Sequence, residues 1–583
     1  MPLIPQQGRV GVVGGGISGL TYAYFLASLR PDLRIDLYEK SARCGGYIRS
    51  KRLGTTEYDS RANQDYTILE KGPRTLRGES PGVLLILDLL FKCNAQNELL
   101  GISKNSLGNR KYLLSPHSDT EGHSGKLTPV PYSLSSFLRF LFDPLGMGVL
   151  LGLLKEPFVR SKSTPDETVE QFVSRRFNKS VSDNVVSAIM HGVYAGDVAK
   201  LSAASVLSRL VDIERQHGSI VRYGVSQLLQ SLRKRTPDQL APEVALYSKV
   251  FKPAFNVSKT ARFLRKFPVL TMRDGLESLV AALQKNLPAN VSVHTNTAVR
   301  GVAQTEDGLE LALSTGETAR VDHLRLTVDA PGTAAVLQSA EIGALVAPVE
   351  YTTVVLANVY VPALRLLSHP GFGFLVPKTM QDETQLLGVI FDSDIEQNSR
   401  RLFFYNDVST ELTSESPISD EKLAGLAKAV ANRGAVITNS YTKLTLMLGG
   451  HQLKSGEDLP TRSRVHKIVR DVLMSKLHID LEKCNGAEVI EIEYWTDAIP
   501  QYRVGHEELK KKVAAAVRQV FGDKVTLGGT TFGDGVGVPD CVVQSFTEAY
   551  AATVDSEFGH DAQQNGVSNE NPNPQSKNYT TYR

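Results

Sequence analysis

The chain has 583 residues, 42% of them hydrophobic and 22% charged, which is ordinary for a soluble globular protein of roughly two or three domains. Its formal net charge of +3 is too small to argue for a nucleic-acid partner. The four cysteines lack metal-ligand spacing and indicate no disulfide framework, and no apolar run is long enough to span a membrane.

The first predicted unit is a strand, a glycine-rich turn and a helix. The stretch 12–20, "VVGGGISGL", contains Gly14, Gly16 and Gly19 in the pattern GxGxxG, and "TYAYFLASL" follows as a helix. Such glycines let a backbone turn approach a pyrophosphate at a helix N-terminus. Glu39 ends the next apolar strand, 39 − 19 = 20 residues after Gly19, where an acid binds a ribose hydroxyl. The pattern predicts a dinucleotide site, for NAD or for FAD.

Two further glycine-rich stretches favour FAD over NAD. In "EKSARCGGYIRS", Arg43 and the pair Gly45 and Gly46 form a second tight turn, which suits a longer cofactor. In 525–542, "VTLGGTTFGDGVGVPDCV", an apolar strand leads through glycines into a helix predicted from about Gly537. The positive end of that helix could face the pyrimidine side of a flavin. The two ends of the chain would then build one FAD site.

Other segments carry structural expectations. The most apolar stretch is 133–159, and composition alone favours its burial over insertion into one leaflet of a membrane. The stretch 206–266 has twelve Lys or Arg against four Asp or Glu, which fits a solvated basic surface or attraction to an anionic membrane. The stretch 309–328 alternates as a hairpin, and 555–583 has a disordered composition. The first strand begins near Arg9, which leaves no room for a cleaved targeting peptide.

These motifs resemble known flavoproteins. The run "E-x-x-x-R-x-G-G" from Glu39 and the later "LEKGPRT" resemble the FAD-containing amine oxidase superfamily, in which the second segment lies by the flavin. The segments "HGVYAGD", "GFGFLVP", "LLGVIFDS" and "AIPQYRVGH" resemble the protoporphyrinogen oxidase family, and the last, 498–506, is the most specific. The similarity runs from about residue 9 to 554, and the length and polar insertions resemble a fungal member.

The resemblance implies an α/β protein. Its Rossmann-like FAD-binding domain, of the amine-oxidase/p-hydroxybenzoate-hydroxylase type, would be interleaved with an α+β substrate domain and a helical membrane-binding domain. The FAD-binding domain would comprise 9–90, 271–330 and 520–554. The helical domain would cover 105–235, the substrate domain mainly 331–519, and the tail 555–583 would be disordered.

The resemblance also assigns site residues. Arg110, in "NRKYL", matches an arginine that pairs with a substrate propionate, and Gly192 matches a glycine at the pocket wall. Family members often have Arg where this chain has His191. No catalytic side chain and no metal site is assigned. One non-covalent FAD per chain would contact Gly14, Gly15, Gly16, Ile17, Ser18, Gly19, Glu39, Lys40, Arg43, Gly46, Tyr47, Gly72, Pro73, Arg74, Thr75, Val299, Thr531, Val536, Gly537 and Val538.

The implied reaction is the oxidation of protoporphyrinogen IX to protoporphyrin IX, the penultimate step of haem synthesis. It would proceed in three two-electron steps, with O2 as the acceptor giving H2O2. The family implies monotopic attachment of 133–159 to the mitochondrial inner membrane, on the intermembrane-space side, without a cleaved presequence. It also implies a homodimer and ferrochelatase as a partner.

Two rival functions stay open. A polyamine or monoamine oxidase would need an aromatic cage by the flavin, and often a cysteine bound covalently to the flavin before the C-terminal glycines. The stretch 528–532 contains no cysteine. A prenylated-GTPase escort protein shares the fold and binds lipid without flavin; the intact glycine motif with Glu39 argues against that reading.

Overall fold

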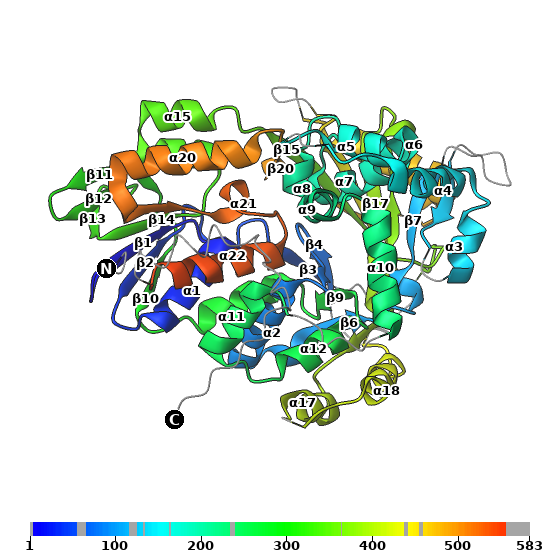
Figure 1. Ribbon diagram of the computed structural model, residues 1–583, viewed down its shortest axis with the longest axis horizontal. Coiled ribbons are helices and arrows are strands. Elements are labelled where there is room, and N and C mark those ends of the chain that lie inside the picture. The colour runs from blue at the N-terminus through cyan, green and yellow to red at the C-terminus, as the bar shows by residue number, and fades with distance from the viewer. Residues whose placement is uncertain are drawn as a thin grey trace, which may run out of the picture.

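The computed structural model describes most of the chain, and Figure 1 shows a sheet with covering helices beside a second sheet with its own helices. The predicted disorder of 555–583 lies outside the described residues. No helix within the described ranges is long and apolar enough to cross a membrane. These ranges are 4–54, 66–115, 125–131, 134–162, 165–233, 240–362, 364–414, 416–436, 441–453, 459–484 and 486–554.

A five-stranded parallel sheet brings together the start, the middle and the end of the chain. Its strands are short, apolar and buried at most positions, as expected for a parallel sheet covered on both faces. In spatial order they are β10 (Val291–His294), β2 (Arg34–Tyr38), β1 (Arg9–Val13), β14 (His323–Leu326) and β21 (Val525–Leu527).

One face of this sheet is covered by helices. They are α1 (Ile17–Leu29), α2 (Pro81–Lys92), α13 (Glu277–Lys285) and α22 (Val538–Ala551), which share one apolar core. Helix α22 begins one residue after the predicted start, and Gly537 is its N-cap. The helices α11 (Pro242–Phe251), α12 (Val257–Leu264), α17 (Asn406–Thr413) and α18 (Asp420–Ala431) extend this core at the bottom of Figure 1.

The other face carries an antiparallel meander and helices. The meander is β11 (Val299–Thr305), β12 (Gly308–Leu313) and β13 (Thr318–Val321), and it confirms the predicted hairpin. The second strand of the predicted hairpin is divided into two strands. The first is β13, and the second, β14, leaves the meander and joins the parallel sheet beside β1. Helices α14 (Ala330–Leu337), α15 (Ala340–Val346) and α20 (His506–Phe521) complete this layer.

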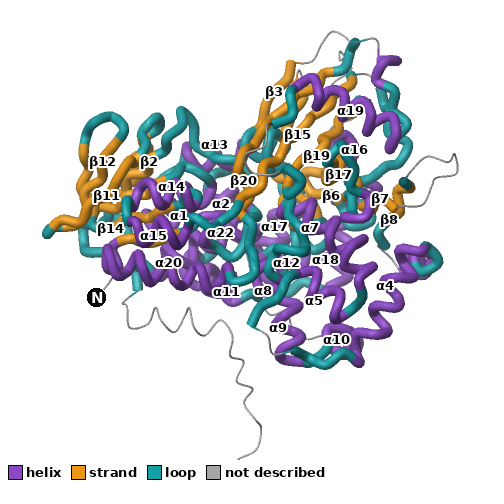
Figure 2. Tube along the Cα trace, turned by 90° about the horizontal axis from the view of Figure 1, so that it is seen from above, coloured by secondary structure: helices purple, strands orange, loops and turns teal. Residues whose placement is uncertain are grey.

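A seven-stranded sheet forms the second half of the molecule. Helix α19 (Arg462–Leu477) covers one of its faces, whereas α7 (Ser187–Tyr194) lies on the other (Figure 2). The stretch 105–235 supplies two of the strands and is therefore not wholly helical. In spatial order the strands are β20 (Val489–Pro500), β15 (Tyr351–Val361), β19 (Thr442–Gly450), β17 (Leu386–Ile390), β16 (Gly373–Leu375), β7 (Lys111–Ser115) and β8 (Lys126–Pro129).

Small sheets connect the two halves. A two-stranded ribbon pairs β3 (Ser50–Gly54) with β4 (Tyr66–Glu70). A four-stranded sheet has the order β18, β6, β9, β5, and β5 continues directly from the loop that follows β4. The bounds are β18 (Ser399–Arg401), β6 (Leu99–Ile102), β9 (Val269–Met272) and β5 (Leu76–Arg77).

A helical region lies on the side of the seven-stranded sheet away from α19 (Figure 2). Composition favoured burial of 133–159, and this expectation is wrong for many of its apolar side chains: Phe142 is 88% exposed and Phe158 82% exposed. The two phenylalanines lie in turns before and after α4 (Pro144–Lys155), which is apolar along most of its length but packs only one face on the protein. The region contains α3 (Leu134–Phe140), α4, α5 (Val169–Arg176), α7, α9 (Ser208–His217) and α10 (Ile220–Arg233).

Candidate cofactor and substrate site

Each glycine of the first turn is favoured for a different structural reason. Gly14 adopts a φ of 104°, which L side chains rarely reach, and its N–H donates to the Tyr38 carbonyl at 2.9 Å. A Cβ on Gly19 would lie 1.9 Å from the Gly14 oxygen, so the fold itself excludes one. Gly16, by contrast, has an ordinary extended backbone, and a Cβ there would meet nothing within 4 Å. The space before α1 therefore suits a ligand that needs close backbone approach.

A second turn lies directly against the first. The N–H of Gly45 donates to the Gly15 carbonyl at 2.8 Å. The Arg43 guanidinium donates to the Gly46 carbonyl at 2.8 Å and to the Ile48 carbonyl at 3.0 Å. Arg43 therefore shapes the Gly45–Gly46 turn, and its side chain acts on the backbone of the site.

Glu39 occupies the position predicted for a ribose acceptor. Its side chain is 8% exposed, and its two oxygens accept from the N–H groups of Gly15 at 2.7 Å and Ser41 at 2.8 Å. A carboxylate has further acceptor capacity beyond these bonds. The N–H of Thr297 donates to the Glu39 carbonyl at 2.9 Å, which brings the loop that leads to Val299 beside it. The predicted adenine-end residues are thus neighbours.

Helices α1, α2 and α22 pack together beside these turns. Ser545, in the middle of α22, donates from its hydroxyl to the Ser18 carbonyl at the start of α1 at 2.9 Å. A Cβ on Gly82, the second residue of α2, would lie 2.1 Å from the carbonyl oxygen of Pro539, the second residue of α22. The positive ends of α2 and α22 are therefore close together, the start of α1 packs against α22, and the free N–H groups of these helix ends favour an anionic ligand.

The second glycine loop leads from β21 into α22. It contains the short helix α21 (Gly529–Phe532), with Gly529 at a φ of 76°. Thr531 is buried, and its hydroxyl is hydrogen-bonded to the Tyr351 hydroxyl at 2.8 Å. The predicted contact residues 536–538 form the entry to α22. Sequence reasoning missed Tyr351, whose only signal was an aromatic residue at a strand start.

The segment after β4 lies against the second turn. A Cβ on Gly72 would lie 1.9 Å from the Tyr47 carbonyl oxygen. The Tyr47 ring meets Trp495 edge-on, with 5.2 Å between centroids, and the Trp495 indole N–H donates to the Lys71 carbonyl. Desolvation raises the pKa of Tyr47 to about 12, so its phenol is neutral. Trp495, the single tryptophan of the chain, was not predicted as a site residue.

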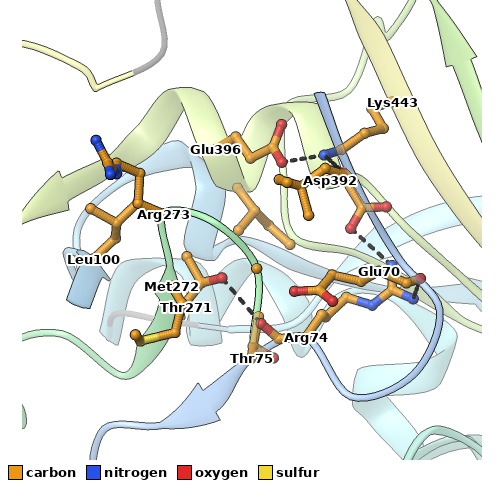
Figure 3. A pocket seen from close by; sticks show the side chains of 13 residues that line it. Glu70, Arg74, Thr75, Leu100, Thr271, Met272, Arg273, Asp392, Glu396 and Lys443 are labelled. Atoms are coloured by element: carbon orange, nitrogen blue, oxygen red, sulfur yellow. Dashed lines mark hydrogen bonds and ion pairs between the residues drawn. The ribbon is translucent and has the colours of Figure 1, made fainter. Parts of the chain in front are cut away.

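The Arg74 side chain points toward Asp392 (Figure 3). Its guanidinium donates to the carboxylate of Asp392 at 2.9 Å and to the hydroxyl of Thr445 at 2.6 Å. Asp392 begins α16 (Asp392–Asn398), and Thr445 lies on β19. Arg74 is 7% exposed, so its ion pair with Asp392 is buried.

A small cavity of about 30 Å³ lies beside this pair, enough for on the order of two waters. It is lined by Glu70, Lys443 and Glu396, with Lys443 and Glu396 in an ion pair (Figure 3). Burial raises the pKa of Glu70 to about 7, although the Ser50 hydroxyl donates to its carboxylate at 2.6 Å. Glu70 therefore changes charge near neutral pH.

An apolar layer covers the face of the seven-stranded sheet nearest the cofactor residues. Trp495, Met447 and Ile499 lie partly buried against Leu356 and Leu387. These side chains come from β20, β19, β15 and β17, and Glu493, which pairs with Leu356 across the strands, lies on the same face at the edge strand β20. The layer suits a flat, apolar ligand placed between Tyr47 and α7.

The predicted substrate residues lie at β16. The N–H of Phe372 donates to the Arg110 carbonyl at 2.6 Å, and a Cβ on Gly192 would lie 2.9 Å from a Leu375 methyl group. The structure thus brings Arg110 and Gly192 to one strand. It does not bring them to the glycine turns, because β16 is four strands from β20, on the order of 19 Å at about 4.8 Å per strand.

The remaining predicted contacts vary in exposure. Ile17 and Ser18 are buried in the first turn of α1, and Thr75 is partly buried beside the cavity. Lys40 and Pro73 are exposed. Their cofactor contacts stay predictions.

Comparison with known proteins places this geometry in a family. Residues 17–360 match the family described as "Flavin containing amine oxidoreductase". The chain is 32% identical to a Saccharomyces cerevisiae protein named protoporphyrinogen oxidase, covering 94% of this chain and 98% of that protein. It is 24% identical to a Bacillus subtilis protein named coproporphyrinogen III oxidase, covering 92% and 96%.

Among solved structures, reduced UDP-galactopyranose mutase has a similar fold, with a TM-score of 0.57, 11% identity and 96% of each chain covered. Identity this low supports the fold alone. The comparisons confirm the predicted flavin-binding fold class of the amine-oxidase type, whereas the membrane-binding role of the helical region stays a prediction.

We expect two glycine substitutions to separate folding from cofactor binding. Gly19→Ala should lower the free energy of unfolding by more than about 2 kcal/mol, because its Cβ would meet the Gly14 oxygen at 1.9 Å. Gly16→Ala should unfold like the wild type, yet bind FAD at least about tenfold more weakly, because the methyl enters open space before α1. Urea denaturation and FAD titration measure the two effects. Unchanged FAD affinity in Gly16→Ala would contradict the placement of the diphosphate.

We expect Glu70 to make stability fall as pH rises. The folded protein raises the pKa of Glu70 from 4.5 to about 7, so between these values the folded state holds a proton that the unfolded state has lost. Glu70→Gln removes this loss, at most about 1.4 kcal/mol per pKa unit. The free energy of unfolding of Glu70→Gln minus that of the wild type should be more positive at pH 8 than at pH 5, as measured by urea denaturation. The control is Glu317→Gln, at an exposed turn residue; an equal difference at both pH values for Glu70→Gln would refute the role.

Proposed function

The chain belongs to the flavin-containing amine oxidoreductases and, among them, to the protoporphyrinogen oxidases, and we propose that it oxidises protoporphyrinogen IX to protoporphyrin IX. The observation that carries this proposal is 32% identity to the S. cerevisiae relative across 94% of this chain and 98% of that protein. The chain is an FAD-dependent oxidoreductase, which excludes the flavin-free escort function. The relatives favour a porphyrinogen over an amine as substrate.

The residues present fit FAD. Gly16 leaves open space at the N-terminus of α1, Glu39 lies where the ribose is expected, and the positive end of α1 favours the diphosphate. Thr531 and the entry to α22 would hold the pyrimidine end, from the opposite end of the chain. When bound, FAD supplies the acceptor for two electrons at a time and passes them on to O2.

The protein's own part is to bind, orient and shield the substrate. The apolar layer around Trp495 and Leu356 would hold the macrocycle and keep water out. Arg110 would pair with a propionate, since a guanidinium binds a carboxylate through a two-pronged hydrogen bond. Gly192 would form part of the wall, where the absence of a Cβ lets α7 pack closely on Leu375.

We also propose that the helical region attaches the enzyme to the surface of the mitochondrial inner membrane. Exposed apolar side chains gather on α4, α10 and the turns beside α4, whereas globular surfaces usually expose such residues singly. An apolar substrate drawn from a bilayer would enter near this surface. The residues that support this proposal are Leu138, Phe142, Met147, Leu151, Leu154, Phe158, Val225, Leu228 and Leu229.

We expect purified holoenzyme to convert protoporphyrinogen IX. The two are mixed without oxygen, air is admitted, and porphyrin fluorescence and H2O2 are followed against an enzyme-free control. Coproporphyrinogen III and a polyamine are run in parallel. A protein that oxidises the polyamine but neither porphyrinogen would refute the proposed function, and one that prefers coproporphyrinogen III would move it to the reaction for which the B. subtilis relative is named.

Arg110→Ala should raise KM by about tenfold or more, because a hydrogen bond to a charged group contributes about 1.5–3 kcal/mol. It should change kcat less than KM, since the propionate lies away from the carbons that react. Lys104→Ala, at an exposed residue of the same loop, is the matched control and should behave as wild type. An unchanged KM in Arg110→Ala would remove that residue from the substrate site.

Membrane attachment predicts a loss of vesicle binding in the double variant Phe142→Asp, Phe158→Asp. Each phenylalanine contributes about 1.5–3 kcal/mol when moved from water into an apolar phase, so the partition into liposomes should fall by more than tenfold. Co-sedimentation with liposomes containing anionic lipid measures it. Phe404→Asp, at a side chain that is 47% exposed and lies outside the helical region, should bind as wild type. Equal binding of the double variant would place the contact elsewhere.

A further inference from the structure

Three side chains of the segment 501–506, which joins β20 to α20, are buried although they are polar. Tyr502 is 1% exposed, His506 is 5% exposed and Gln501 is 9% exposed. The N–H of Gln501 donates to the Glu350 carbonyl, and the N–H of Ser202 donates to the Tyr502 carbonyl at 2.7 Å. Burying polar groups costs free energy unless they are hydrogen-bonded, so their partners show what the segment holds in place.

One set of partners lies in the second glycine loop. The Tyr502 hydroxyl donates to the Thr530 carbonyl. The His506 ring stacks on Tyr502, with 4.4 Å between centroids and an 18° interplanar angle. Desolvation lowers the pKa of His506 to about 4, so the ring is neutral, while a hydrogen bond to the Thr531 backbone acts in the opposite direction. Its Nε2 is buried without a hydrogen-bond partner among the described residues, which leaves Nδ1 as the nitrogen that faces the Thr531 backbone.

A second set of partners lies in the wall of the proposed substrate site. The Gln501 side-chain amide donates to the Tyr194 carbonyl at 2.9 Å and to the Thr352 hydroxyl at 3.2 Å. Tyr194 ends α7, and its ring meets Tyr502 edge-on at 5.7 Å. The next residue, Ala195, has a φ of 48°, which an alanine adopts only when its surroundings impose it. Gly192 lies in the last turn of the same helix.

We propose that Tyr502 and His506 are positioning residues that hold the backbone at Thr530 and Thr531 against the cofactor. Through Gln501 the same segment fixes the end of α7, so the cofactor loop and the substrate wall keep one spacing. This inference rests on the proposed role of the second glycine loop in binding FAD.

The test uses Tyr502→Phe in the holoenzyme. The substitution removes only the hydroxyl that reaches Thr530. We expect the release of FAD on dilution to become about tenfold faster. The fluorescence of free FAD measures this release. The visible spectrum of the bound flavin should change and its reduction potential should fall, because the loop that leads into α22 is displaced from it. A merely structural role would lower Tm and leave the spectrum and the potential of the bound flavin unchanged.

Tyr494→Phe is the matched control. Tyr494 lies on β20, and its hydroxyl also donates to a backbone carbonyl, that of Pro460 at 2.8 Å, away from the glycine loop. It should cost similar stability without altering FAD release, spectrum or potential. Tyr502→Phe with wild-type values of all three overturns the proposal.

If Tyr502→Phe does not fold, a pair of variants at His506 tests the same proposal. Asn presents a side-chain donor near the position of Nδ1, whereas Leu has none. We expect His506→Asn to retain FAD like the wild type and His506→Leu to release it about tenfold faster. Equal release by the two variants overturns the proposal. Since these readouts need bound FAD and no porphyrinogen, failure of the proposed substrate leaves them interpretable.

Discussion

The buried ion pair between Arg74 and Asp392 is the contact on which the arrangement of the site depends. It connects the segment beside the second glycine turn to the seven-stranded sheet, with Thr445 as a shared partner. Removing one member of such a pair leaves an unpaired buried charge, at a cost of about 3–5 kcal/mol. The ion pair therefore connects the cofactor side to the substrate side. It helps to fix the spacing between Tyr47 and the apolar layer.

The electrostatics of the cofactor side come from the backbone. The N-terminal turn of α1 lies where the diphosphate is expected, it packs against α22, and the N-terminal turns of α2 and α22 lie close together, so that free backbone N–H groups favour negative charge here. Arg43, for which a cofactor contact stays a prediction, donates to the carbonyls of Gly46 and Ile48. This charged side chain thus shapes the second turn, and the helix ends and glycines are predicted to contact the ligand.

Local patterns predicted the elements that are formed by neighbouring residues. The turn at Gly14, the strand that ends at Glu39 and the helix that starts after Gly537 all follow from short-range rules of backbone geometry. The stretch 133–159 was misjudged because apolarity alone does not say which face of a helix has a partner. In the folded chain these helices pack one face only, and the other stays uncovered.

By itself the sequence determined the dinucleotide motif and, through its resemblance to known families, the cofactor and the reaction. Both rest on short segments whose geometry is local. Only the tertiary structure decided that Arg74 meets Asp392 across 318 residues, and that Trp495 meets Lys71 across 424. The physical reason is that a side chain's partner depends on where distant strands are placed in a sheet. No local spacing encodes that placement, so Trp495, Tyr351 and Tyr502 became visible only in the fold.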